Sequence, residues 1–283
     1  MRLIFHVGAH KTGTSAIQAF LSKNRDELAV QGIWYAPSAG HMNHSPLAQD
    51  FQRSGQAGSA AIHECIEDGE RAGCSTILFS SECFSEHPFR EVAFQESLRG
   101  LETLVIGYVR RPDDIVISAY NEIVRDSTHR WTDSLDAKLP YDPTYISIFK
   151  RWIGPGKPWR FIVAPYDQDQ WVGGTLLSDF SVMIGADPSS MKQEIDRDAA
   201  NRSLPAPLIE VMRAINRIGL SDDHHRAVVQ AMYRASEDSP HLYEVDDGIS
   251  DARRAAYRKS FESVAVLFRP HYRPGFNEDF MIA

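Results

Sequence analysis

Short apolar runs recur along the first 165 residues, and polar or small residues follow each of them. The runs fall at residues 2–7, 33–36, 75–81, 104–109 and 159–165. Nearly every residue in the run at 104–109 is apolar, whereas a strand with one solvated face alternates apolar and polar residues. Strands of this kind are buried on both faces, so the pattern predicts a parallel sheet with helices on each side.

Helical periodicity fills most of the intervals between these runs. Apolar residues recur three or four positions apart, Gly32 suits a helix end, and Pro112 suits a helix start. The pattern predicts helices over residues 14–31, 59–72, 88–99, 112–126 and 144–153. The polar stretches 37–58 and 127–143 are predicted to be irregular and to line a site. Only helical patterns occur after residue 172.

Together these elements predict an α/β fold of three layers, with a central parallel sheet flanked by helices and a helical C-terminal part. The chain has 283 residues, no internal repeat and no obvious linker. We therefore expect a single domain over residues 1–283. Its α/β core would span residues 1–170, and a mostly helical extension would span residues 171–283.

Composition narrows the classes of function. The formal net charge of −8 argues against a nucleic-acid partner, so an anion site must be a local basic pocket. Cys65, Cys74 and Cys83 have no paired spacing, which is typical of buried thiols in a reducing compartment. No apolar run approaches the roughly 20 residues of a membrane span, and the N-terminal run is shorter than that of a signal peptide. We expect a cytoplasmic enzyme without stable membrane insertion.

The strand at 2–7 leads through the segment GAHKTGTS into the helix at 14–31. A strand, a glycine-rich turn and a helix present backbone N–H groups and a positive dipole end to a phosphate. Gly8 and Gly13 have the spacing of the nucleotide-binding loop G-x-x-x-x-G-K-[ST]. Thr14, however, stands where that loop has its lysine, and Lys11 lies three residues earlier. This displacement disfavours a Mg²⁺-dependent kinase or NTPase, which stays open as an alternative.

The loop resembles the 5′-phosphosulfate-binding loop of the sulfotransferases that use 3′-phosphoadenosine 5′-phosphosulfate. In that family a strand ends in P-K-[ST]-G-[ST]-[ST] and passes into a helix. The residues in the matching positions here are Lys11, Thr12, Gly13, Thr14 and Ser15. His10 replaces the usual proline. The match points to the bacterial or carbohydrate-type branch of the family, and it implies that the three-layer fold is P-loop NTPase-like.

A second signature of the family is an arginine at the end of a later strand and a serine eight residues on, which together hold the 3′-phosphate. Arg110 and Ser118 have this spacing, and Pro112 opens the helix between them. An arginine supplies a planar fork of donors for phosphate oxygens. The eight-residue spacing selects Arg110 over its neighbour Arg111, which we expect at the surface.

The resemblance implies transfer of a sulfuryl group from this donor to an acceptor hydroxyl, with adenosine 3′,5′-bisphosphate as product. Lys11 would face the leaving-group oxygen, and Thr12 to Ser15 would donate to the 5′-phosphate. The family uses a glutamate or a histidine as base. Glu82, just past the strand at 75–81, stands where the glycan-modifying branch carries its glutamate. The rival bases are His10, His41, His44 and His87.

The donor has no β/γ-phosphate bridge, so the resemblance implies no metal. The acceptor is expected to be a carbohydrate, a glycolipid precursor or a small metabolite, and the sequence indicates neither which one nor an oligomeric state. Trp34, Trp131 and Trp152 are candidates either for stacking on an adenine or sugar or for core packing. A noncatalytic nucleotide-binding protein is the second alternative.

Overall fold

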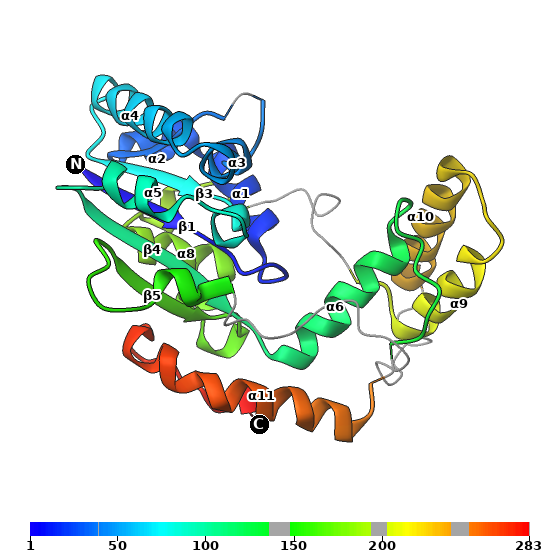
Figure 1. Cartoon of the computed structure of the whole chain (residues 1–283). Helices are drawn as coiled ribbons and strands as arrows, with labels where there is room; N and C mark the ends of the chain where they lie inside the picture. The colour runs from blue at the N-terminus through cyan, green and yellow to red at the C-terminus, as the bar shows by residue number, and fades with distance from the viewer. Residues whose placement is uncertain (39, 136–147, 194–202, 239–248, 283) are drawn as a thin grey trace.

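The computed structural model describes residues 1–38, 40–135, 148–193, 203–238 and 249–282. Its centre is a sheet of five parallel strands in the order β2-β3-β1-β4-β5 (Figure 1). The strands are β1 (Arg2–His6), β2 (Ile33–Tyr35), β3 (Thr76–Ser80), β4 (Glu102–Val109) and β5 (Arg160–Pro165). The five predicted strands are thereby confirmed.

Each central strand is buried on both faces. Leu3 and Phe5 of β1 belong to one hydrophobic cluster, and Ile4 between them belongs to another. The same alternation holds in β4, where Val105 joins the first cluster and Ile106 the second. The near-continuous apolar sequence of these strands therefore serves two cores, one on each side of the sheet.

Helices cover both faces of the sheet (Figure 1). The helices described are α1 (Thr14–Lys23), α2 (Arg25–Val30), α3 (Ser45–Arg53), α4 (Gln56–Arg71), α5 (Glu91–Ser97), α6 (Pro112–Arg125), α8 (Leu176–Ile184), α9 (Ala206–Asn216), α10 (Asp222–Asp238), α11 (Asp251–Phe268) and α12 (Asp279–Ile282). Helices α1, α2 and α8 pack on one face, and α3, α4, α5 and the end of α11 pack on the other. The predicted three-layer α/β fold with a helical C-terminal part is confirmed.

A third hydrophobic cluster lies away from the sheet, among α6, α9, α10 and the first half of α11 (Figure 1). Val124 of α6, Met212 of α9 and Met232 of α10 are buried in it. Helix α6 therefore begins at the sheet and ends in a separate packing centre. The division of the chain at residue 170 stays a prediction, and α8 packs beside α1 on the sheet.

The predicted helix at 14–31 is two helices, because Asn24 interrupts it. The backbone of Asn24 has φ −112° and ψ 25°. Its amide nitrogen donates to the carbonyls of Phe20 and Lys192, at 2.9 and 3.1 Å, and its amide oxygen accepts from the N–H of Lys192 at 2.7 Å. Lys192 is 168 residues away in sequence, so local periodicity carried no sign of this break.

The prediction that residues 37–58 are irregular is wrong in its second half, which forms α3 and the start of α4. Leu47, Ala48 and Phe51 give α3 a buried face, and proline at the start of the helix fixes a helical φ. Polar residues on the opposite side of α3 conceal this face in the composition. Helix α5 is shorter than the predicted helix at 88–99.

Two predictions fall partly outside the described residues. Within the predicted loop at 127–143, residues 127–135 form neither helix nor strand, and 136–143 lie outside. Within the predicted helix at 144–153, residues 148 and 149 are helical and lead into a 3₁₀ turn at Lys150–Trp152, and 144–147 lie outside. The three cysteines are free thiols, as expected, but only Cys74 is buried, and Cys65 and Cys83 are partly exposed.

Candidate active site

The loop between β1 and α1 continues the sheet pairing past the end of β1. The N–H of Val7 donates to the carbonyl of Ile106 at 2.9 Å, and the N–H of Ala9 donates to the carbonyl of Tyr108 at 3.2 Å. This pairing carries the loop along β4 to the carboxyl edge of the sheet. Crevices at this edge are the usual ligand sites of open parallel sheets.

The loop then turns back into α1 through two left-handed residues, Lys11 (φ 64°) and Gly13 (φ 75°). The hydroxyls of Thr12 and Thr14 both donate to the carbonyl of Ala9, at 2.7 and 3.0 Å, and brace the turn. Thr12 is fully buried. In this loop conformation, therefore, neither threonine directs its hydroxyl hydrogen towards a ligand.

Gly13 is required by space as well as by its backbone angle. A Cβ on this residue would lie 2.3 Å from Cδ2 of Leu176 and 3.0 Å from the ring of Tyr166. No side chain caps the N-terminus of α1, which starts at Thr14. The first N–H groups of a helix have no partners within the helix, so this end offers donors and a positive dipole end to an anion.

A cavity of about 290 Å³ opens at this point of the sheet edge. It brings together residues from the β1–α1 loop, from the turn after β3, from the end of β4, from α6 and from the end of β5. The lining residues are His10, Lys11, Gly13, Thr14, Ser15, Ala16, Glu82, Arg110, Ser118, Glu122 and Tyr166. Every site residue predicted from the sequence is among them except Thr12, which lies beneath the loop.

Two cations line this cavity, and both are held by neighbours. The ammonium group of Lys11 pairs with the carboxylate of Glu122 on α6. The guanidinium of Arg110 donates to the carbonyl of Lys11 at 3.2 Å, lies 3.8 Å from a carboxylate oxygen of Asp114, and stacks over the ring of Tyr166. These contacts fix the positions of the two positive charges at the edge of the cavity.

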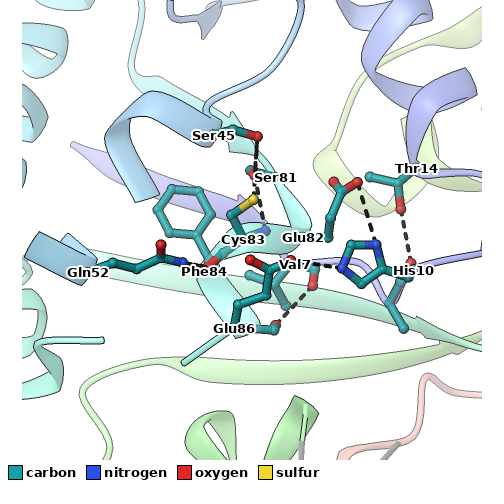
Figure 2. A network of polar contacts seen from close by, with 12 residues as sticks. Val7, His10, Thr14, Ser45, Gln52, Ser81, Glu82, Cys83, Phe84 and Glu86 are labelled. Carbon is teal, nitrogen blue, oxygen red and sulfur yellow. Dashed lines mark hydrogen bonds and ion pairs between the residues drawn. The ribbon is translucent and has the colours of Figure 1, made fainter. Parts of the chain in front are cut away.

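Glu82 begins a 3₁₀ turn (Glu82–Ser85) directly after β3. Its Oε2 accepts from the amide of Gln18 on α1 at 3.1 Å, and its Oε1 lies 3.8 Å from Nδ1 of His10. Nε2 of His10 also contacts a carboxylate oxygen of Glu86 at 3.0 Å. Figure 2 shows the imidazole of His10 between these two carboxylates.

The two carboxylates change the acid–base behaviour of His10. Burial disfavours its charged form, but the hydrogen bond to Glu86 and the charges of Glu82 and Glu86 outweigh burial and raise the pKa of His10 above its ordinary value. The same hydrogen bond, as its largest cause, lowers the pKa of Glu86. His10 is thus a partly exposed imidazole with a raised pKa at the mouth of the cavity.

Of the rival bases, only His10 lines the cavity. His41 and His87 are exposed, and His87 contacts Arg151. His44 is buried between the carbonyl of Ala36 and the N–H of Ser80, and burial lowers its pKa to about 4. None of these three histidines is among the lining residues, which leaves Glu82 and His10 as the candidates for a base.

The structure separates Arg111 from Arg110. Arg111 pairs with the buried carboxylate of Asp113, at 2.9 Å, and does not line the cavity. It is therefore partly buried and structural, not the surface residue that we expected. The aromatic candidates Trp34, Trp131 and Trp152 do not line the cavity either, and all three pack in or against hydrophobic clusters.

Three lining residues were missed from the sequence, and two of them, Glu122 and Tyr166, have polar side chains; the third is Ala16. Tyr166 follows β5 directly, so the rule that ligand residues of a parallel sheet lie just past its strands could have found it. Glu122 lies four residues after Ser118, on the same face of α6, and the helical period could have placed it in the cavity.

Among the residues that the structure describes, no group of three or more His, Cys, Asp or Glu side chains could hold a metal ion. Over the same residues, every helix is too short or too polar to cross a membrane.

No family model matches the chain, and no curated protein matches it in sequence. Among solved structures, the chain is similar to the crystal structure of a sulfotransferase from Alicyclobacillus acidocaldarius. The two chains are 18% identical, and the match covers 76% of this chain and 92% of that chain with a TM-score of 0.42. We draw nothing about function from a similarity at this level, and the residues of the cavity carry the interpretation.

Proposed function

We propose that this protein is a sulfotransferase that moves a sulfuryl group from 3′-phosphoadenosine 5′-phosphosulfate to an acceptor hydroxyl. The observation that supports the proposal is the composition of one cavity. It combines an uncapped helix N-terminus, two separate cations and a carboxylate at the carboxyl edge of a parallel sheet. An anionic donor with two phosphate groups needs the first two features, and activation of a hydroxyl needs the third.

The donor would lie across the β1–α1 loop. Its 5′-phosphosulfate would contact Lys11 and the first amides of α1, where the helix dipole favours negative charge. Its 3′-phosphate would contact Arg110 and Ser118, which line the cavity on the α6 side. Ser15 and Ser118 make no side-chain hydrogen bonds with other described residues, so their hydroxyls can turn to a ligand. The threonine hydroxyls of the loop keep a structural role.

In the transfer step, the acceptor oxygen forms a bond to sulfur while the bond between sulfur and the phosphate oxygen breaks. The acceptor proton passes to a carboxylate oxygen of Glu82. The charge that the phosphate gains is balanced by the ammonium of Lys11, which must exchange Glu122 for the phosphate. Apart from Gly13, Ala16 and Tyr166, the lining side chains are polar or charged, which suits a hydroxylated acceptor such as a carbohydrate.

Calorimetry with two nucleotides tests the donor. We expect adenosine 3′,5′-bisphosphate to bind equally well with and without a metal chelator. Binding of ATP only in the presence of Mg²⁺, with no binding of the bisphosphate, would contradict the proposal and favour a kinase or NTPase.

Two variants test the enzyme. With labelled donor and a panel of glycans, phenols and lipids, Glu82→Gln should lower turnover by roughly 10²- to 10⁴-fold and leave bisphosphate affinity nearly intact. Lys11→Ala should lower both turnover and affinity. Wild-type turnover in Glu82→Gln would move the role of base to His10. Binding of the bisphosphate without transfer to any acceptor would favour a noncatalytic nucleotide-binding protein.

A further inference from the structure

A chain of amide groups leads from the start of α3 to the carboxylate of Glu82. The backbone N–H of Ser45 donates to Oδ1 of Asn43 at 3.1 Å. Nδ2 of Asn43 donates to Oε1 of Gln18 at 3.3 Å, and Nε2 of Gln18 donates to Oε2 of Glu82 at 3.1 Å. Three segments that are distant in sequence thus meet at one carboxylate.

The direction of these bonds is dictated by the first donor. A backbone N–H can only donate, so Asn43 must turn its oxygen to Ser45 and its nitrogen to Gln18. Gln18 must then offer its oxygen to Asn43, which leaves its N–H for Glu82. The opposite orientation of Gln18 would place two donors against each other at Asn43 and two acceptors against each other at Glu82. The amide of Gln18 has one satisfactory orientation.

The surroundings hold this chain in place. The side chain of Gln18 is almost completely buried, at 4% exposure, within α1. The hydroxyl of Ser45 pairs at 3.0 Å with the hydroxyl of Ser81, the residue before Glu82 (Figure 2). The chain of amides begins at the start of α3 and ends at the turn after β3. The hydroxyl pair therefore joins these two segments directly as well.

We propose that Gln18, oriented by Asn43, is a positioning residue for Glu82. Its N–H donates to Oε2 and holds the carboxylate in one orientation. Oε1 is left on the side of His10 and the cavity, where a hydroxyl proton would arrive. This role rests on the proposed function of Glu82 as a base. It also assigns a function to the polar stretch around Asn43, which orients that base.

Substitution of Gln18 by methionine tests the positioning. The variant Gln18→Met keeps the length of the side chain and removes the donor. We expect kcat to fall roughly tenfold to a hundredfold, with bisphosphate affinity unchanged. Gln52→Met is the matched control, because Gln52 donates at 3.1 Å to the carbonyl of Cys83 beside Glu82 but does not touch the carboxylate of Glu82. It should keep the wild-type kcat.

Substitution of Asn43 tests the chain of amide groups without changing Gln18. Asn43→Asp still accepts from the N–H of Ser45 but offers no donor, so the amide oxygen of Gln18 loses the partner that fixes the orientation of this amide towards Glu82. We expect a loss in kcat similar to that of Gln18→Met, and no further loss in the double variant, since both changes break one bond. Additive losses, or a wild-type kcat in Gln18→Met, would overturn the proposal.

A spectroscopic measurement separates this proposal from the proposed function. In ¹H–¹⁵N spectra, the side-chain amide signal of Gln18 should move in Glu82→Ala, while that of Gln52 should not. A Gln18 signal that stays in place contradicts the hydrogen bond between Gln18 and Glu82, whether or not the enzyme transfers sulfuryl groups. If the signal moves but the protein sulfates no acceptor, the hydrogen bond is supported. Sulfuryl transfer is then rejected, and the positioning role is rejected with it.

Discussion

Two groups of charged residues lie on either side of the start of α6, and their surroundings differ. On one side Arg110 faces the cavity, where its ion pair with Asp114 is long, at 3.8 Å, and both partners are partly exposed. On the other side Asp113 is fully buried and accepts from three guanidinium groups. These belong to Arg111 and to two residues of α11, Arg254 and Arg258, at 2.8 to 3.4 Å.

The contrast shows how neighbours in sequence acquire different roles. Arg110 and Arg111 follow the same strand and are chemically identical, yet one is oriented to a cavity and the other joins α6 to α11. Removal of a buried carboxylate that is surrounded by arginines lowers the stability of the fold, because the remaining charges lose a partner. A loosely paired cation beside a cavity can exchange its partner for a ligand at little cost.

Loss of the buried carboxylate should have the largest effect on stability. We expect Asp113→Asn to lower the free energy of unfolding by about 3–5 kcal/mol, measured by urea denaturation, since three arginines lose this buried carboxylate as a partner. Asp114→Asn is the matched control on the same helical turn, and we expect about 1 kcal/mol or less because Asp114 is partly exposed. Equal losses in the two variants would mean that the helix dipole, which both share, dominates.

The two arginines should differ in ligand binding. We expect Arg110→Ala to weaken binding of adenosine 3′,5′-bisphosphate by roughly tenfold to a hundredfold, since hydrogen bonds to charged groups contribute about 1.5–3 kcal/mol. Adenosine 5′-phosphate, which lacks the 3′-phosphate, should bind the variant and the wild type alike. Arg111→Ala should lower stability and leave both affinities unchanged. Equal weakening of both nucleotides by Arg110→Ala would remove Arg110 from the 3′-phosphate site.

Glu122 should oppose the donor, because its carboxylate holds Lys11 in the absence of ligand and repels an incoming phosphate. An exposed ion pair is worth about 0–1 kcal/mol, so Glu122→Gln should raise bisphosphate affinity by roughly two- to fivefold in calorimetry. The control Glu86→Gln changes a carboxylate that does not line the cavity and should leave the affinity unchanged. A fall in affinity with Glu122→Gln would mean that Glu122 orients Lys11 for the ligand.

The residues of the cavity could be predicted from the sequence more completely than the bounds of the helices around it. Lys11, Glu82 and Arg110 were named by the family resemblance. Each follows a strand, and the carboxyl ends of parallel strands share one edge, so the apolar runs place these three residues together. Tyr166 obeys the same rule and needed only its application to the last strand. The directions of Arg110 and Arg111 could not be predicted, because they depend on Asp113 and on α11, about 140 residues later.

Errors in the predicted helices share a physical cause. Helix α3 was missed because its buried face is narrow, with Leu47, Ala48 and Phe51 among polar residues. The break at Asn24 was missed because its partner, Lys192, comes from a distant segment. Hydrophobic periodicity reports which face is buried, but it does not report which polar side chain will leave the helix to bond elsewhere.

The smallest expected effect is the pH dependence of the contact between His10 and Glu86. The raised pKa of His10 means that its stabilisation is complete below its ordinary value of about 6.5 and disappears as the pH rises through the higher folded value. The lowered pKa of Glu86 removes the contribution as the pH falls through that value, below about 4.5. Both groups are partly exposed, so we expect the contact to contribute less than about 1 kcal/mol to the free energy of unfolding.

Urea denaturation should therefore show the largest difference in stability between wild type and His10→Gln between about pH 4.5 and 6.5, and almost none at about pH 9. Glu86→Gln should bring the NMR titration of His10 to lower pH. If His10 of the wild type titrates at or below its ordinary value, burial and not the two carboxylates determines the pKa of His10.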